Sequence, residues 1–197
     1  MEMRYNLSEI TSVIKDRRSI KPEKYAIRKL HKEMVEDILN NAIWAPSHGL
    51  TQPWRYKVFM GDGLKKLGKE LPRIYDSVMG EKANELKKEK IRSRTEKSSV
   101  IIAICMEREE AERIPEIEEV QAVACSVQNM YLTCTAYGIG GYWSSPKFIY
   151  SDEMKRFLGL GQKDRCLGLF YMGYPEGKWP KSHRKPLEYV TEWINEE

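Results

Sequence analysis

The chain has 197 residues, of which 41% are hydrophobic and 31% are charged, and its formal net charge is +4. This length suits one domain with a substantial core, and the composition indicates a soluble, globular protein, so we expect a single domain over residues 1–197. The mild positive charge could attract an anionic cofactor. It falls short of the concentrated basic patch that a nucleic-acid-binding protein presents.

Membrane, secreted and metal-binding classes are not indicated either. The strongest apolar run, Val100–Met106, has the length of a strand, well below the ~18 residues of a membrane helix. The N-terminus shows no signal-peptide core, so we expect a cytoplasmic protein without a membrane partner. Four cysteines form no Cys-x-x-Cys pair, and no histidine stands at zinc-ligand spacing from them. We therefore expect buried free thiols and no metal site.

Hydrophobic periodicity predicts helices and strands in alternation. The first helix is expected at Leu7–Asp16, where apolar residues recur on one face and Asn6 or Ser8 can cap the first turn. In chain order, the further elements are a helix at His31–Trp44, a strand at Tyr56–Met60, a helix at Leu64–Leu71, a solvated charged helix at Glu81–Lys97, a strand buried on both faces at Ser99–Met106, a long helix at Val120–Tyr137, a short helix at Ser151–Leu158, a strand at Cys166–Gly173, and a strand or irregular arm at Glu188–Ile194. This order indicates an α/β or α+β domain and leaves the sheet topology open.

Two polar motifs come after the first two helices. Arg17, Arg18 and Ser19 stand directly after the first helix. Guanidinium groups bind phosphate bidentately and keep their charge at any working pH. The segment 46–55, Pro-Ser-His-Gly-Leu-Thr-Gln-Pro-Trp-Arg, comes after the second helix. Together the motifs suggest a pocket for a phosphorylated ligand with a large polar ring. The alternative for the arginines is a helix C-cap, where cations meet the helix dipole favourably.

Two glycine-containing motifs complete a pattern. Residues 138–143, Gly-Ile-Gly-Gly-Tyr-Trp, come after the long helix, and residues 173–175, Gly-Tyr-Pro, come after an apolar run. The four motifs, in this order, resemble the small single-domain members of the nitroreductase family of FMN-dependent oxidoreductases. The resemblance implies an α+β fold with a central mixed sheet flanked by helices in three layers. It also implies an intertwined homodimer, with the long helix at the interface and the C-terminal arm crossing to the partner.

The resemblance further implies a bound FMN, with NAD(P)H as the co-substrate. The residues expected at the FMN phosphate are Arg17, Arg18, Ser19 and either Arg184 or Lys185; those expected along the flavin are Pro46, Ser47, His48, Gln52, Trp143, Ser144 and Ser145. A backbone N–H at Ser144 or Ser145 would stabilise negative charge on the reduced ring. His48 could equally be an exposed loop histidine, the Arg184–Lys185 pair a solvated tail, and the glycines of residues 138–141 in part a helix C-cap.

No Ser-His-Asp or Cys-His set is evident, and flavin chemistry needs none, so no catalytic acid or base is expected. The resemblance implies ping-pong transfer from NAD(P)H through flavin N5 to a small-molecule acceptor such as a nitroaromatic or a quinone. The charged segment 81–97 corresponds to a region that can cover the active site in the family. The alternatives are an FMN-binding protein without reductase turnover, and a specialised flavin enzyme for flavin destruction or dehalogenation. A nucleic-acid-binding domain fits the charge alone.

Overall fold

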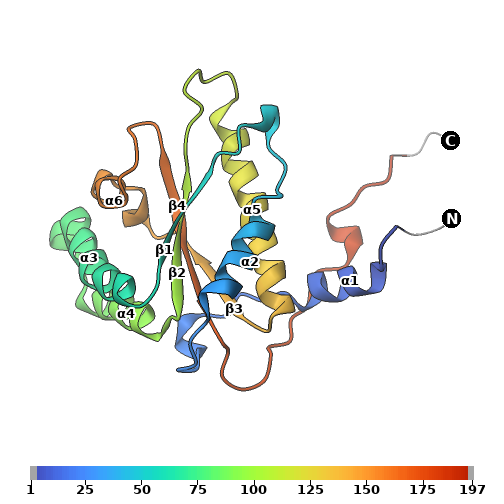
Figure 1. Ribbon diagram of the computed structural model, residues 1–197, viewed down its shortest axis with the longest axis horizontal. Helices are drawn as coiled ribbons and strands as arrows, with labels where there is room; N and C mark the ends of the chain where they lie inside the picture. The colour runs from blue at the N-terminus through green and yellow to red at the C-terminus, as the bar shows by residue number, and fades with distance from the viewer. Residues whose placement is uncertain (1–3, 195–197) are drawn as a thin grey trace.

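The computed structural model describes residues 4–194 and arranges most of them in three layers (Figure 1). The central sheet is covered on one side by α2 (Lys32–Ala42) and α5 (Glu116–Ala136), and on the other by α3 (Asp62–Met79), α4 (Glu85–Lys97) and α6 (Asp152–Leu158). Within residues 4–194, no helix combines the length and apolar character needed to cross a bilayer. The prediction about a signal peptide rests in part on residues 1–3, which lie outside the described residues.

The sheet has four strands in the order β1 (Trp54–Phe59), β2 (Val100–Met106), β4 (Arg165–Gly173) and β3 (Gly140–Ser144). All three strand pairs are antiparallel. Among the described residues, the mixed character that we expected is limited to one parallel bridge between Ser19 and Gly141. The predicted α+β class and three-layer arrangement are confirmed.

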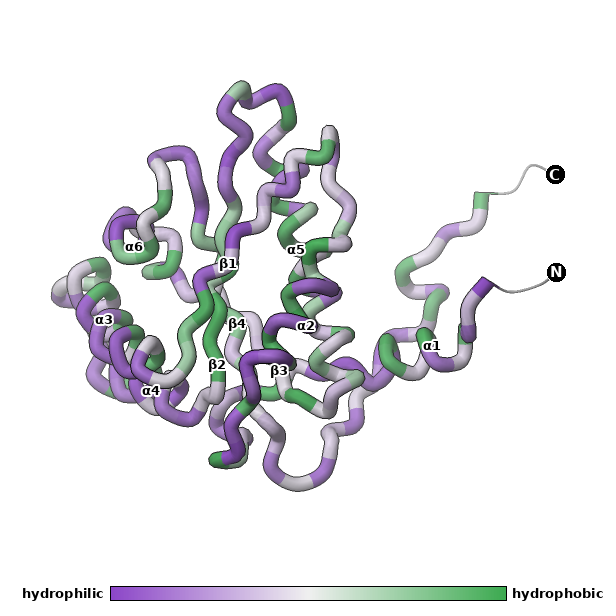
Figure 2. Tube along the Cα trace, in the orientation of Figure 1, coloured by the Kyte–Doolittle hydropathy of each residue, from purple (hydrophilic) through white to green (hydrophobic). Residues whose placement is uncertain are grey.

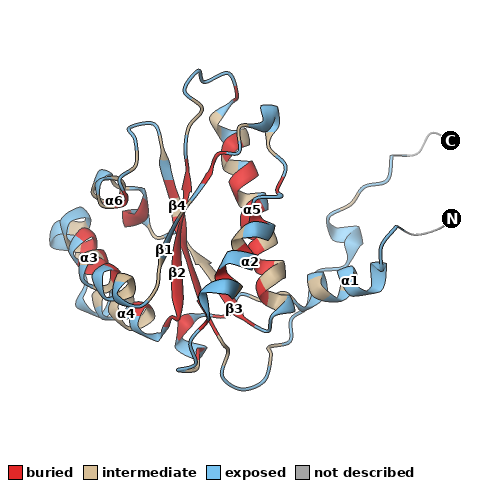
Figure 3. Ribbon diagram, in the orientation of Figure 1, coloured by how far each residue is buried: buried red, intermediate tan, exposed pale blue. Residues whose placement is uncertain are grey.

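β2 is the centre of the core, as its apolar sequence predicts. Every one of its residues is buried (Figure 3). Side chains of a strand alternate between the two faces of the sheet, so β2 contributes to both halves of the core. Val100, Ile102, Ile104 and Met106 pack with α2 and α5, whereas Ile101, Ala103 and Cys105 pack with α3 and α6.

α3 is longer than the helix predicted at Leu64–Leu71, because it continues through Pro72 to Met79. Proline inside a helix removes one backbone hydrogen bond. The buried residues Leu67, Leu71, Ile74 and Tyr75 keep the spacing of one helical face on both sides of Pro72. Their packing against the sheet outweighs the local cost of the proline, so the helix continues eight residues beyond the predicted end at Leu71.

A strand that we did not expect, β3, begins two residues after the left-handed Gly138, which has a φ of 67°. The Ile139 N–H donates to the carbonyl of Cys134 at 2.7 Å, as in a Schellman C-cap. The C-cap interpretation of Gly138 is therefore confirmed, and residues 140–144 beyond it form an edge strand instead of a loop. At the other end of the chain, residues 188–194 form an irregular arm with a 3₁₀ turn at Leu187–Tyr189.

α1 (Leu7–Asp16) and the C-terminal arm extend together away from the three layers (Figure 1). Asn6 caps α1 as predicted, its side chain accepting hydrogen bonds from the N–H groups of Ser8 and Glu9. No residue of α1 is buried, and its apolar residues Leu7, Ile10 and Ile14 are exposed. Figure 2 shows hydrophobic positions along this helix. The arm likewise exposes Tyr189, Val190 and Trp193, each by about three quarters of its surface.

Candidate functional site

Tyr131 of α5 connects two of the predicted motifs. Its hydroxyl accepts a hydrogen bond from the backbone N–H of Trp143 at 2.8 Å and lies 3.4 Å from the Ser19 hydroxyl. The guanidinium of Arg17 lies over the Tyr131 ring, 5.2 Å from its centroid, and bonds weakly to Ser19 at 3.4 Å. We call Arg17, Ser19, Tyr131 and Trp143 the Tyr131 cluster. It unites the arginine motif with the third motif, although they lie more than 120 residues apart in sequence.

Arg17 carries a charge that the rest of the described chain does not neutralise. No carboxylate of residues 4–194 lies within ion-pair distance of its guanidinium. The side chain is only partly exposed, and it stacks on an aromatic face at the C-terminal end of α1. Serine and arginine side by side, with donors to spare, can bind a phosphate group.

Trp143, Ser144 and Ser145 lie against β4. The Ser145 hydroxyl donates to the carbonyl of Leu167 at 2.7 Å. The indole Nε1–H of Trp143 is buried and donates to no atom of the described residues, which is unusual for a buried donor. Gly168 makes this arrangement possible: it has a φ of 140°, and a Cβ there would lie 2.5 Å from both Trp143 Nε1 and Ser145 Oγ.

Arg18, the second predicted phosphate ligand, binds backbone carbonyls instead. Its Nε donates to Pro180 at 2.8 Å, and its Nη1 donates to the carbonyls of Lys15 and Arg17. Trp179 Nε1 also donates to the carbonyl of Asp16 at 2.7 Å, so the chain after β4 is fastened to the end of α1. The bonds to the carbonyls of Lys15 and Arg17 match the helix C-cap considered as the alternative for the arginine pair, and the phosphate role of Arg18 stays a prediction.

The C-terminal cations are not in contact with the Tyr131 cluster. Both Arg184 and Lys185 are exposed, and the Arg184 guanidinium donates to its neighbours Ser182 and His183. The anchored residues Trp179 and Pro180 nevertheless bring this segment back to the helix end that carries Arg17.

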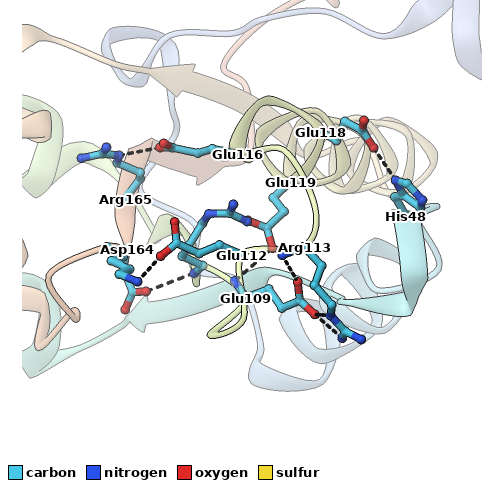
Figure 4. A network of polar contacts seen from close by, with 11 residues as sticks. His48, Glu109, Glu112, Arg113, Glu116, Glu118, Glu119, Asp164 and Arg165 are labelled. Atoms are coloured by element: carbon cyan, nitrogen blue, oxygen red, sulfur yellow. Dashed lines mark hydrogen bonds and ion pairs between the residues drawn. The ribbon is translucent and has the colours of Figure 1, made fainter.

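The loop that holds Pro46, Ser47, His48 and Gln52 lies at the opposite end of α5. His48 Nδ1 lies 2.6 Å from the Glu118 carboxylate, in the first turn of α5 (Figure 4). Pro46, His48 and Gln52 are exposed, and Ser47 is half-buried. Leu50 and Gln52 have positive φ values of 54° and 45°. Left-handed non-glycine residues store strain and gather at functional sites, so this loop is a functional candidate on conformational grounds as well.

The two halves of the predicted site do not meet in one chain. Glu118, which holds the loop, and Tyr131, which holds the other motifs, are 13 positions apart in one helix. At 1.5 Å per residue they are separated by about 20 Å along the helix. The structure therefore brings together Arg17, Ser19 and Trp143, with Ser144 and Ser145 next in the chain, and leaves His48 and its loop apart.

The glycines of the third motif face the protein's own side chains. A Cβ on Gly141 would lie 2.7 Å from the Phe170 ring and 3.2 Å from Tyr131. A Cβ on Gly140 would lie 3.0 Å from Tyr25. These glycines let the edge strand lie close to the core, which accounts for them without a ligand.

Tyr25 holds the segment after the arginine motif against the sheet. Its hydroxyl donates to the carbonyl of Ile20 at 2.7 Å and lies 3.0 Å from that of Tyr171. Burial raises the pKa of Tyr25 well above its ordinary value, since ionisation would leave a charge in the core. Tyr25 therefore stays protonated and fixes Ser19 next to Gly141.

Sequence reasoning missed Tyr131, Gly168 and Glu118. Tyr131 was hidden in an apolar helix, Gly168 in a buried strand, and Glu118 among several acidic residues. A polar aromatic residue within a long apolar helix was the one available signal.

Two cavities lie near these elements, and neither connects the Tyr131 cluster with the loop of residues 46–52. One, of about 340 Å³, lies beside Arg18 and Trp179. The other, of about 800 Å³, lies between α3 and α4, away from every predicted site residue.

The three-layer α+β fold and the order of the four motifs define the class of scaffold, and comparison with known proteins identifies the family. The model of the nitroreductase family matches residues 14–174, and the chain belongs to this family. YdjA of Escherichia coli K12, assigned as an NAD(P)H nitroreductase, is 26% identical over 161 residues, which cover 81% of this chain and 86% of YdjA.

Solved structures of nitroreductase-like proteins have a fold similar to that of this chain. A nitroreductase-like family protein from Bacillus cereus has a TM-score of 0.82 and 25% identity, with all of both chains covered. A Desulfovibrio desulfuricans protein described as a nitroreductase, in complex with FMN, has a TM-score of 0.74 and 24% identity over 97% of this chain and 99% of its own. The fold expected from the resemblance is confirmed.

Proposed function

We propose that the chain is an FMN-dependent NAD(P)H oxidoreductase, a single cytoplasmic domain that acts as a homodimer on nitroaromatic or quinone-type acceptors. Membership of the nitroreductase family and the NAD(P)H nitroreductase assignment of YdjA support the oxidoreductase class. The FMN complex of the D. desulfuricans protein supports the cofactor. The observation that carries the proposal is the Tyr131 cluster, which presents an unneutralised Arg17 beside Ser19.

In this proposal Arg17 and Ser19 hold the FMN phosphate. The residues present fit that group, because Arg17 has spare donors, no carboxylate neighbour in residues 4–194, and an orientation fixed by the Tyr131 ring. Arg18 contributes through its carbonyl contacts, by fixing the backbone on either side of Arg17. Arg184 or Lys185 adds a second cation to the phosphate site.

Trp143, Ser144 and Ser145 form the part of the site that faces the flavin ring. When bound there, FMN would supply the chemistry of two-electron transfer between NAD(P)H and the acceptor. The chain's own contribution is orientation and charge stabilisation. The hydroxyl of Tyr131 and the carbonyl of Leu167 fix the backbone and side chains of this segment, so that its remaining donors are held in place before a ligand arrives.

The loop of residues 46–52 contributes to the site of the partner copy. α5 separates it from the Tyr131 cluster by about 20 Å within one chain, and a second copy can bring the two halves to one flavin. The exposed apolar faces of α1 and the C-terminal arm support such a dimer, as does Trp44, which is 84% exposed. Glu118 positions His48 in that loop.

The first experiment is the visible spectrum of the purified protein before and after anaerobic addition of NAD(P)H. We expect a flavin band that bleaches. A band that persists would favour a flavin binder without reductase turnover, and no band after incubation with FMN would contradict the proposal.

Single substitutions then test the site. Arg17→Ala should weaken FMN binding by at least about tenfold, the loss expected for a charged hydrogen bond. Lys15→Ala, on the same helix, is the matched control and should leave FMN affinity unchanged. Equal affinities of wild-type protein and Arg17→Ala would remove Arg17 from the phosphate site.

A further inference from the structure

A third cavity, of about 400 Å³, adjoins the predicted flavin segment. It lies between α3, α4 and the chain after β3, and Ser144 is part of its wall. Lys87, Lys90 and Arg94 line it from α4, and Lys147 lines it from the segment after Ser144. None of the described residues that line it is acidic. A concave surface with charge of one sign concentrates the field and attracts anions.

The three cations of α4 gather on one face of the helix because they are spaced i, i+3 and i+7. α4 has three carboxylates, and none of them lines this cavity. Glu85 and Glu89 bond to Arg92, and Glu85 also pairs with Lys88, while Glu96 lines the separate cavity between α3 and α4. Like charges at these spacings oppose helix formation. A face that concentrates them at a cavity is therefore suited to an anionic ligand.

Arg94 is anchored while the lysines are free. The Arg94 Nε donates to Glu23 at 2.9 Å, and its guanidinium lies over the ring of Tyr142. Lys87, Lys90 and Lys147 are exposed and form no ion pair with residues 4–194. The three lysines thus carry the positive charge that an incoming ligand would meet.

We propose that this cavity binds the 2′-phosphoadenosine end of NADPH and makes the enzyme prefer NADPH to NADH. The inference rests on the proposed function, in which a reductant binds at the flavin beside Ser144. Ser144 belongs to both places, so a ligand that reaches the flavin can extend into the cavity. The 2′-phosphate is the group by which NADPH differs from NADH, and cationic side chains select it.

The test measures nucleotide binding to the flavin-loaded dimer by calorimetry, with adenosine 2′,5′-bisphosphate and adenosine 5′-monophosphate as probes. We expect the bisphosphate to bind wild-type protein about tenfold more tightly, as two exposed ionic contacts would produce. The variant Lys90→Ala/Lys147→Ala should lose this difference and, in turnover, the KM preference for NADPH. Lys97→Ala, an exposed lysine of α4 outside the cavity, should retain both.

Equal binding of the two probes by wild-type protein would overturn the inference. Loss of FMN in the double variant would also overturn it, because the two lysines would then bind the flavin instead of the nucleotide. A third refuting result is a double variant that binds both nucleotides as the wild-type protein does but has a raised KM for a carboxylated nitroaromatic. The cavity would then bind the electron acceptor. The proposed function is tested separately, because a protein with a flavin band that bleaches equally with NADH and NADPH refutes only this inference.

Discussion

The buried ion pair between Arg108 and Glu119 permits a quantitative prediction of stability. Glu119 is fully buried in α5, and the Arg108 side chain is 8% exposed. The other Glu119 oxygen accepts the backbone N–H of Glu109 at 3.1 Å. Glu119→Gln keeps the shape and leaves the guanidinium buried without its counter-charge. Breaking a buried pair from one side costs about 3–5 kcal/mol, which in a domain of this size lowers Tm by about 6–20 °C.

Urea unfolding followed by circular dichroism measures this cost. Glu110→Gln, on the same loop, is the surface control and should change the unfolding free energy by less than about 0.5 kcal/mol. Replacing both partners by apolar residues, Arg108→Met with Glu119→Leu, should recover most of the loss, since no charge then stays buried. A loss below about 1 kcal/mol in Glu119→Gln would show that water reaches Arg108, and would refute the reasoning.

Three further results are expected. Tyr131→Phe should lower the unfolding free energy by about 1–3 kcal/mol, because the Trp143 N–H loses its acceptor. It should also shift the flavin spectrum, and an unchanged spectrum would show that Tyr131 does not position the flavin segment. Gly168→Ala should cost about 1–3 kcal/mol through contact with Trp143, whereas Gly177→Ala, at a positive φ in open space, should cost less; equal costs would contradict this. Hydrogen bonding to Arg165 lowers the pKa of Glu116 below its ordinary value of 4.5. The stabilisation from this pair is therefore fully present above pH 4.5 and is lost as the pH falls through the lowered pKa. The urea midpoint of Glu116→Gln should vary less with pH than that of wild-type protein, and equal slopes would argue against the pair.

Much of the fold could be predicted because its signals are local. Leu7–Asp16 carries its own cap and apolar stripe, and Val100–Met106 is an apolar run that only a central strand can bury. α3 and β3 depended on contacts made elsewhere. Tertiary packing carries α3 past Pro72, and β3 is a strand because β4 pairs with residues of low strand propensity such as Gly140 and Gly141.

The site shows the same division. The motifs contain the polar residues, but the sequence does not indicate which of them meet. Ser19 and Trp143 come together through the Tyr131 hydroxyl and through the bridge between Ser19 and Gly141, which are contacts between segments far apart in the chain. The difference between Arg17 and Arg18 could not be predicted either, since it depends on the return of Pro180 to the end of α1. The cofactor-binding roles of all the predicted site residues stay predictions, those of the residues that the structure brings together included.

The length of α5 has a consequence for genetics. If each end of this helix serves a different flavin, a subunit lacking Arg17 and a subunit altered at His48 have defects in opposite half-sites. A mixed dimer of the two then contains one site with both defects and one with none. Random reassortment of two inactive homodimers would restore about a quarter of the wild-type sites, since half of the dimers are mixed and each has one intact site. The two defects should thus complement each other between copies of the gene, although neither allele alone encodes a working enzyme.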